Sequence, residues 1–281
     1  HRFSLGDAEV TTIQDGAHLR EPINPPFSLE KSKADIKKIA DMNNLPSSGF
    51  ENSYTPTVIQ ISKQTVLFDT GFGEMGRNNH AGNLRRRLGQ AGYAPEDIDV
   101  VAFTHCHPDH IAGIMEAGAL AYPNARYVIG RREYDAWKDG SEIPPQRVQN
   151  REMFLNLLPP LADQITFVED GDYIVPGLTA EASFGHSLGH MMYRAESAGK
   201  ALLIWGDVTN HYVFSLQYPE STVGFDDDKE MAVISRKRVL DMVATDGLLV
   251  SGHHMPFPSV GYVERHGDSF RWTPASYQLR M

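Results

Sequence analysis

The chain has 281 residues, 41% of them hydrophobic, which is enough for a packed core in one large α/β domain or two small ones. A formal net charge of −10, with no basic run longer than the three arginines at 85–87, disfavours nucleic acid as a partner. No apolar run reaches the roughly 18 residues that a membrane-spanning helix needs.

The single cysteine, Cys106, excludes an intrachain disulfide and a structural zinc site built on cysteines. One cysteine fits a reducing compartment, so a soluble cytoplasmic protein is expected. The first residues, HRFSLGDAEV, contain neither a starting methionine nor the apolar segment of an export signal. A periplasmic location is the alternative if such a signal has been removed.

The first part of the chain alternates β-rich segments with helical patterns. Residues 1–50 are predicted to form an N-terminal extension with an amphipathic helix over 31–42, capped by Ser32, which suits a lid or the arm of a homodimer. Residues 54–62 and 64–71 form a predicted hairpin. A helix near 81–91 precedes a buried strand over 97–105, and residues 111–120 are predicted to be helical.

The second part continues with a strand over 125–130 and a helix over 131–140. A run of strands follows at 164–170, 173–177, 178–184, 191–197 and 200–207. The clearest amphipathic helix spans 226–247, where an acidic start suits the helix dipole. Residues 248–258 end the core, and 270–279 trail after it. The alternation predicts one layered α/β domain over 1–281, with helices outside two sheets.

Side chains that can bind metal follow the ends of several apolar strands. Because neighbouring strands of a sheet end at the same edge, these side chains are expected to converge on one site. They are Asp69 after TVLF, His105 after VVAF, His186 after EASF, Asp207 after LLIW, and His253 and His254 after LLVS.

The stretch FTHCHPDHIAG contains the densest group of these donors. His105 and His107 are two residues apart, so they cannot share a helix face, and a strand-to-helix loop is required. Asp109 and His110 follow at once. Imidazole and carboxylate groups suit zinc, and also iron or manganese. With His186, Asp207 and His254 the donors number seven, which suits two ions better than one.

The order of these motifs resembles that of the metallo-β-lactamase superfamily. HCHPDH matches its HxHxDH motif, and LFDTG, with Asp69, resembles its first motif. FGH at His186, WGD at Asp207 and SGHHMPFP at His254 resemble the third to fifth. The C-terminal third looks most similar to methyl parathion hydrolase and the N-acyl-homoserine lactonase-like members.

The resemblance implies an αβ/βα four-layer sandwich of two mixed sheets with helices outside. It also implies two divalent metal ions, zinc before manganese, iron or cobalt. His105, His107 and His186 would bind one ion, Asp109, His110 and His254 the other, and Asp207 both. A metal-bridging hydroxide would cleave a small ester substrate, with Asp109 as the catalytic proton shuttle. Asp69 would orient a ligand histidine from outside the metal shell.

Several alternatives stay open at this point. His190 competes with His186, and His253 with His254, although the family motif selects His254. Cys106, between two ligands, is expected to point away from the metals. The substrate is a lactone, an aryl ester or an organophosphate triester. A β-lactamase, a thioester hydrolase, and a non-hydrolytic metal-binding or redox protein are the alternative functions.

Overall fold

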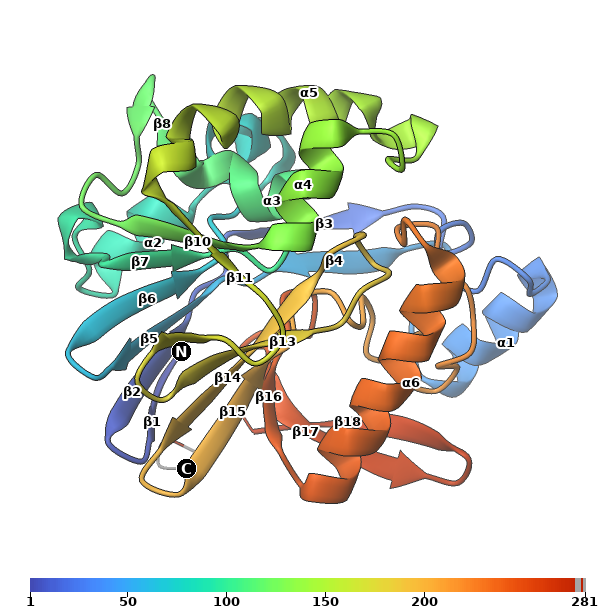
Figure 1. Ribbon diagram of the computed structural model, residues 1–281. Helices are drawn as coiled ribbons and strands as arrows, with labels where there is room; N and C mark the ends of the chain where they lie inside the picture. Colours follow the sequence, from blue (N-terminus) through green and yellow to red (C-terminus); the bar gives the residue numbers. More distant parts are fainter. Residues whose placement is uncertain (276–278, 280–281) are drawn as a thin grey trace.

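The computed structural model describes residues 1–275 and 279, and its strands form two facing sheets of seven strands each (Figure 1). In the first sheet β1, β2, β5 and β6 run antiparallel, whereas β6, β7, β10 and β11 run parallel. Its order is β1 (Arg2–Leu5), β2 (Ala8–Thr12), β5 (Thr57–Ile61), β6 (Gln64–Phe68), β7 (Val100–Ala102), β10 (Arg126–Gly130) and β11 (Ile165–Val168).

The second sheet is also mixed, because β15 and β16 are parallel while the other neighbours are antiparallel. Its order is β12 (Tyr173–Val175), β13 (Leu178–Ala182), β14 (Met191–Ser197), β15 (Lys200–Ile204), β16 (Leu249–Ser251), β17 (Val260–His266) and β18 (Ser269–Pro274). The strands predicted over 125–130 and 164–207 are therefore confirmed.

Both faces of each sheet are buried, which gives the four layers. In β6, Val66 and Phe68 point into the core between the sheets, and Leu67 points to the opposite face. That outer face lies under α2 (Leu84–Gln90), α3 (Pro108–Ile111), α4 (Arg131–Asp139) and α5 (Val148–Leu157). On the second sheet, α6 (Lys229–Asp246) packs through Val239 and Val243. The predicted αβ/βα sandwich is confirmed (Figure 1).

Residues 1–50 contribute to the body of the fold as well as to its periphery. They include β1 and β2 of the first sheet, and β3 (Gly16–Arg20), which pairs with β4 (Phe50–Tyr54). Helix α1 (Lys33–Met42) begins at the predicted cap, Ser32, whose hydroxyl accepts from the Asp35 amide. Its buried face packs against Phe27 and Phe214. The role of this helix as a lid or dimer arm stays a prediction.

Two segments differ from the sequence prediction. The helix expected over 111–120 ends early: a 3₁₀ turn at Ala112–Ile114 is followed by the hairpin of β8 (Met115–Glu116) and β9 (Ala119–Leu120). Ala117 and Gly118 adopt left-handed φ angles, which a helix cannot contain. Residues 270–279 were expected to trail, but β18 extends the second sheet; 276–278 lie outside the described residues.

The remaining elements are short. Further 3₁₀ turns lie at Gly73–Asn79, Pro95–Asp97, Pro145–Arg147 and Pro159–Gln164. None of the described helices combines the length and apolar composition that crossing a bilayer requires.

Candidate metal centre

The loops that follow the strands bring the predicted donors together. Because β6 and β7 are parallel, their carboxyl ends meet at one edge of the first sheet, and β15 and β16 do the same in the second. Asp69 follows β6, the 105–110 loop follows β7, Asp207 follows β15, and His253 and His254 follow β16. The predicted convergence of strand ends is confirmed.

Three imidazoles form what we call the first donor group: His105, His107 and His186. His105 Nε2 lies 3.0 Å from His107 Nδ1, which lies 3.0 Å from His186 Nε2. All three side chains are buried. Burial lowers the pKa of His107 to about 4, so this ring is a neutral donor at pH 7.

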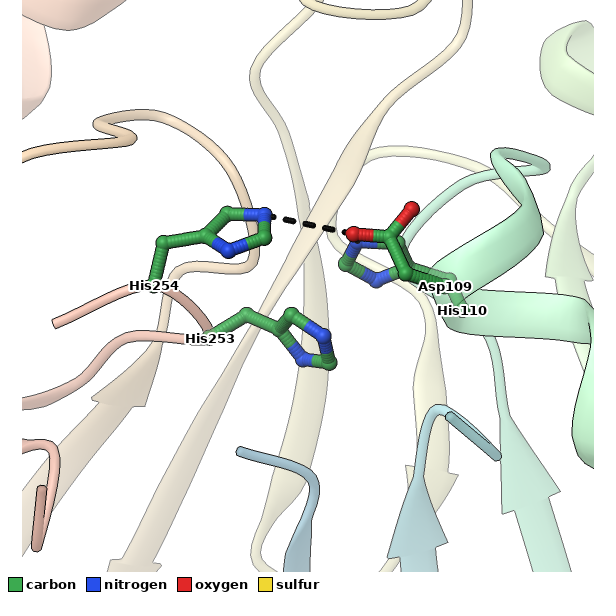
Figure 2. Close-up of side chains that lie close together, drawn as sticks. All are labelled: Asp109, His110, His253 and His254. Carbon is green, nitrogen blue, oxygen red and sulfur yellow. Dashed lines mark ion pairs between the residues drawn. The ribbon is translucent and has the colours of Figure 1, made fainter. Parts of the chain in front are cut away.

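A carboxylate and two imidazoles form the second donor group: Asp109, His110 and His254. Asp109 Oδ2 lies 3.5 Å from His110 Nε2 and 3.4 Å from His254 Nε2. Figure 2 shows His254 facing Asp109 and His110 across a short gap. Asp109 is the most exposed of the predicted donors, with 15% of its side chain accessible.

Asp207 lies between the two donor groups. Its Oδ2 is 3.2 Å from His186 Nε2 of the first group and 2.9 Å from His254 Nε2 of the second. Its Oδ1 is 3.4 Å from His110 Nε2. One carboxylate therefore faces donors of both groups, which is the geometry required of a bridging ligand.

The unsatisfied atoms of the cluster test whether it fits cations. Among the described residues, His110 Nε2 and Asp207 Oδ1 are buried without a hydrogen-bond partner. Leaving such an atom unpaired costs about 1–3 kcal/mol. Both atoms face the centre of the cluster, where a divalent cation would satisfy them together. The donor set, imidazole nitrogen and carboxylate oxygen, is the set that zinc prefers.

The outer nitrogen of each imidazole has a partner away from the cluster, which fixes the nitrogen that faces inward. In the first group His105 Nδ1 contacts Thr104 Oγ1 at 3.0 Å, His107 Nε2 contacts Asp227 Oδ2 at 3.1 Å, and His186 Nδ1 contacts Asp226 Oδ1 at 2.9 Å. In the second, His110 Nδ1 contacts Asp69 Oδ2 at 2.8 Å and His254 Nδ1 donates to the Ser53 carbonyl at 2.8 Å.

Asp69 is itself held by the loop that carries the donors. Its Oδ1 accepts from the Thr104 amide at 2.8 Å and its Oδ2 accepts from the Thr104 hydroxyl at 2.9 Å. The residue adopts a left-handed φ of 62°, which turns its carboxylate toward His110. Asp69 thus lies outside the donor groups and contacts one of their members.

Asp226 and Asp227 are site residues that sequence reasoning missed, because the run Asp226–Asp228 was interpreted as the acidic start of a helix. Only Asp228 caps α6. Asp226 pairs with the buried Arg236 at 2.7 Å, and Asp227 with Arg147 at 2.7 Å. Although burial opposes it, His107 and Arg147 lower the pKa of Asp227 to about 2. The available signal was that the run contains three aspartates, although a helix needs only one cap residue.

Glu133 of α4 was also missed. Its fully buried carboxylate accepts from the Cys106 and Gly189 amides, both at 2.8 Å, and from the Ser187 hydroxyl at 2.6 Å. Burial raises its pKa. Glu133 therefore ties the loop of His105 and His107 to the loop of His186. Nothing in the sequence distinguished it from the other charges of this helix.

The contested histidines have different surroundings. His253 lies close enough to share a cation with the second donor group. Its ring packs against that of His110, with 4.1 Å between the ring centroids, and it does not line the cavity. His254 lines the cavity. His190 uses both nitrogens elsewhere, with Ser183 Oγ at 2.7 Å and the Asp207 amide at 3.0 Å. Cys106 is buried in the apolar cluster beneath the helices. The ligand roles stay predictions.

A cavity of about 210 Å³ opens onto the donors, and Asp109, His107, His186, Asp207 and His254 form its floor. Phe72, Pro108 and Phe225 give it apolar walls. Its polar lining comes from Arg20, Asn52, Arg147, Asn150 and Asn210.

Comparison with known proteins agrees with this arrangement. The profile of the Metallo-beta-lactamase superfamily matches residues 52–254, well over half of the chain. An N-acyl homoserine lactonase of Bacillus cereus is 31% identical over 172 residues, which are 59% of this chain and 60% of that enzyme. An N-acyl homoserine lactonase of a Bacillus species is 26% identical over 220 residues, 70% of this chain and 79% of its own.

Two solved structures share the fold. AidC, described as a dizinc quorum-quenching lactonase in complex with a product, superposes with a TM-score of 0.91 at 24% identity, covering 98% of this chain and 96% of its own. The hydrolase AbOPH, described as belonging to the beta lactamase superfamily, gives 0.90 at 24% identity with the same coverage. The match over 52–254, which is more than half of the chain, shows that the protein belongs to the metallo-beta-lactamase superfamily.

Proposed function

We propose that the protein is a dinuclear lactonase, which binds two divalent ions, zinc first, and hydrolyses the ester of a small lactone. The observation that carries the proposal is Asp207, whose carboxylate faces both donor groups. The names of the Bacillus relatives and of AidC favour a lactone over an aryl ester or a phosphotriester.

The donor groups divide the two ions between them. His105, His107 and His186 would hold one ion, Asp109, His110 and His254 the other, and Asp207 would contact both. Such a pair of ions supplies a water of lowered pKa and an electrophile that polarises the ester oxygen. The carboxylate and arginine partners behind the rings keep the imidazoles in one orientation, so little reorganisation is needed when substrate binds.

Asp109 would move the proton of the reaction. One of its oxygens faces His254, and the other points away from that histidine (Figure 2). Asp109 also lines the cavity, where a ring-opened substrate would expose its leaving oxygen. The outward oxygen of Asp109 would accept the proton that the attacking water loses and deliver it to that leaving oxygen, the task of a general acid.

The cavity positions the substrate over the donors. A volume of about 210 Å³ accepts a five- or six-membered ring together with the start of a substituent. Phe72, Pro108 and Phe225 exclude water from its apolar side, while Asn52 and Asn150 offer hydrogen bonds. A ring held there would bring its ester group to the floor formed by Asp109, Asp207 and His254.

The test combines metal analysis with a substrate panel. The purified protein should contain about two equivalents of divalent metal, and should hydrolyse a lactone faster than an aryl ester, a phosphotriester or a cephalosporin. Chelation should abolish the activity, and added zinc should restore it. His186→Ala should lose metal, whereas His266→Ala, an exposed histidine at the end of β17, should not. Activity that survives complete removal of metal would refute the proposal.

A further inference from the structure

Arg20, the last residue of β3, lies where two cavities meet. It lines the 210 Å³ cavity above the donor groups and also an outer groove of about 850 Å³. Phe225 is the other residue shared by the two linings, and the Arg20 guanidinium lies over its ring at 5.5 Å. The two residues therefore form the passage from the metal cavity into the outer groove.

The two arginines of the metal cavity differ in what they bind. Arg147 forms an ion pair through Nε with Asp227 at 2.7 Å, and its Nη2 donates to the Phe225 carbonyl. Arg20 makes one long hydrogen bond, from Nη2 to the Tyr54 hydroxyl at 3.4 Å. Its Nε is buried without a partner, and no carboxylate pairs with it in the described part of the chain.

A guanidinium with unused hydrogen-bond donors between two cavities indicates that it binds an oxygen atom of a ligand. Its planar set of N–H groups donates to carbonyl or carboxylate oxygens and accepts nothing in return. Tyr54 is not a sufficient partner, because its hydroxyl already accepts from Asn52 Nδ2 at 2.8 Å. The remaining donors of Arg20 are left for a group that enters between the two cavities.

The sizes of the two cavities indicate what that group belongs to. The inner cavity has room for a ring and the first atoms of a substituent, and a longer substituent can continue past Arg20 and Phe225 into the outer groove. Beyond them the outer groove has a wall of Leu19, Pro22, Pro25 and Pro26, which offers an apolar surface to a hydrocarbon chain. The substrate then has three parts: a reacting ring, an accepting oxygen at the passage, and an apolar tail.

We propose that Arg20 selects lactones that carry an acylamide tail, by donating to the amide carbonyl oxygen as the tail passes into the outer groove. This inference rests on the proposed lactonase function and adds the residue that would read the substituent on the ring. A carbonyl is favoured over a carboxylate because Glu21 lines the same groove and would repel a second negative charge.

The experiment compares three lactones that differ in the substituent on the ring. γ-Butyrolactone has no tail, γ-decalactone has an apolar tail without an amide, and N-hexanoyl-L-homoserine lactone has both. For Arg20→Leu, kcat/KM should fall roughly 10- to 100-fold on the third substrate and less than about threefold on the other two, since only the amide loses a charged hydrogen bond. Arg20→Lys should recover part of the loss, because its ammonium can still donate.

Metal content, thermal unfolding and product affinity accompany the kinetics. Arg86→Leu removes a positive charge from the exposed face of α2 and should change none of the three rates. N-hexanoyl-L-homoserine should bind Arg20→Leu at least about 10-fold more weakly by calorimetry. Equal losses on all three lactones, or no loss on the amide substrate while the wild type hydrolyses it, would overturn the role of Arg20 and leave the lactonase function intact. A wild type inactive on every lactone would overturn both.

Discussion

The two donor groups lie side by side and share Asp207, yet they are supported in different ways. Behind the first group lie carboxylates that are themselves paired with arginine: Asp226 with Arg236, and Asp227 with Arg147. Behind the second group lie Asp69, which has no arginine, and the backbone carbonyl of Ser53. Two rings of the first group are thus backed by carboxylates paired with arginine, whereas in the second group one ring is backed by an unpaired carboxylate and the other by the backbone.

The difference matches the composition of the groups. The first consists of three imidazoles and no carboxylate, so negative charge behind the rings raises their basicity toward a cation. The second already contains the Asp109 carboxylate, which brings its own charge. Asp109 also borders the cavity. A carboxylate–arginine network like that behind the first group would hold it more rigidly and leave it less free to change its hydrogen bonds. We therefore expect the first group to be the tighter metal site.

The largest effect is expected at the residue common to both groups. Asp207→Ala removes an oxygen from each and should lower the metal content from about two equivalents to less than one. Its activity should fall by more than the roughly 10- to 100-fold that loss of an outer partner costs. Elemental analysis and lactone hydrolysis measure the two effects. Asp268→Ala, at an exposed turn, is the control. If one ion stays bound at full affinity, Asp207 is not shared.

A smaller effect, confined to the second group, is expected at His254. His254→Ala removes the ring that faces Asp109 and Asp207, so one equivalent of metal should be lost while the first group keeps its own. His253→Ala should retain both, because its ring packs on His110 outside the cavity. Equilibrium dialysis against zinc compares the two variants. Greater metal loss from His253→Ala would reverse the assignment.

Substitution of a carboxylate behind one of the imidazoles should have the smallest effect on metal binding. It should also show which donor group that carboxylate supports. Asp226→Asn should lower the affinity of the first donor group for zinc by roughly 10- to 100-fold. Asp69→Asn should lower the affinity of the second donor group by a similar factor. Competition with a chromogenic chelator resolves the two affinities. If both variants weaken the same ion, the division into two groups is wrong.

The same pair of variants compares, in protein stability, a carboxylate that is paired with arginine and one that is not. Asp226→Asn leaves the buried Arg236 without its ion-pair partner and should lower the free energy of unfolding by about 3–5 kcal/mol. Asp69→Asn leaves no arginine unpaired and should cost less. Urea denaturation of both proteins in chelator avoids a contribution from bound metal. Equal losses would show that the Asp226–Arg236 pair contributes nothing specific.

Much of the fold and of the donor set was predictable from local patterns. Alternating apolar residues identified the strands, and Ser32 and the acidic start of α6 identified helix ends. The segment after His110 was misjudged, because the chain turns into a hairpin at Ala117 and Gly118 and packs at Gly113 against the chain after β6, where a Cβ would be 1.9 Å from the Thr70 carbonyl oxygen. That contact involves residues remote in sequence and leaves no periodic signal.

The sequence by itself determined which side chains could bind metal, and that they follow strand ends, because residue chemistry and strand patterning are local properties. Only the tertiary structure decided which ring nitrogens face inward, that Asp227 lies behind His107 at a separation of 120 residues, and that Arg20 is left without a carboxylate. These are pairings between distant segments. They depend on how the two sheets pack and where their loops meet, and no short stretch of sequence records that.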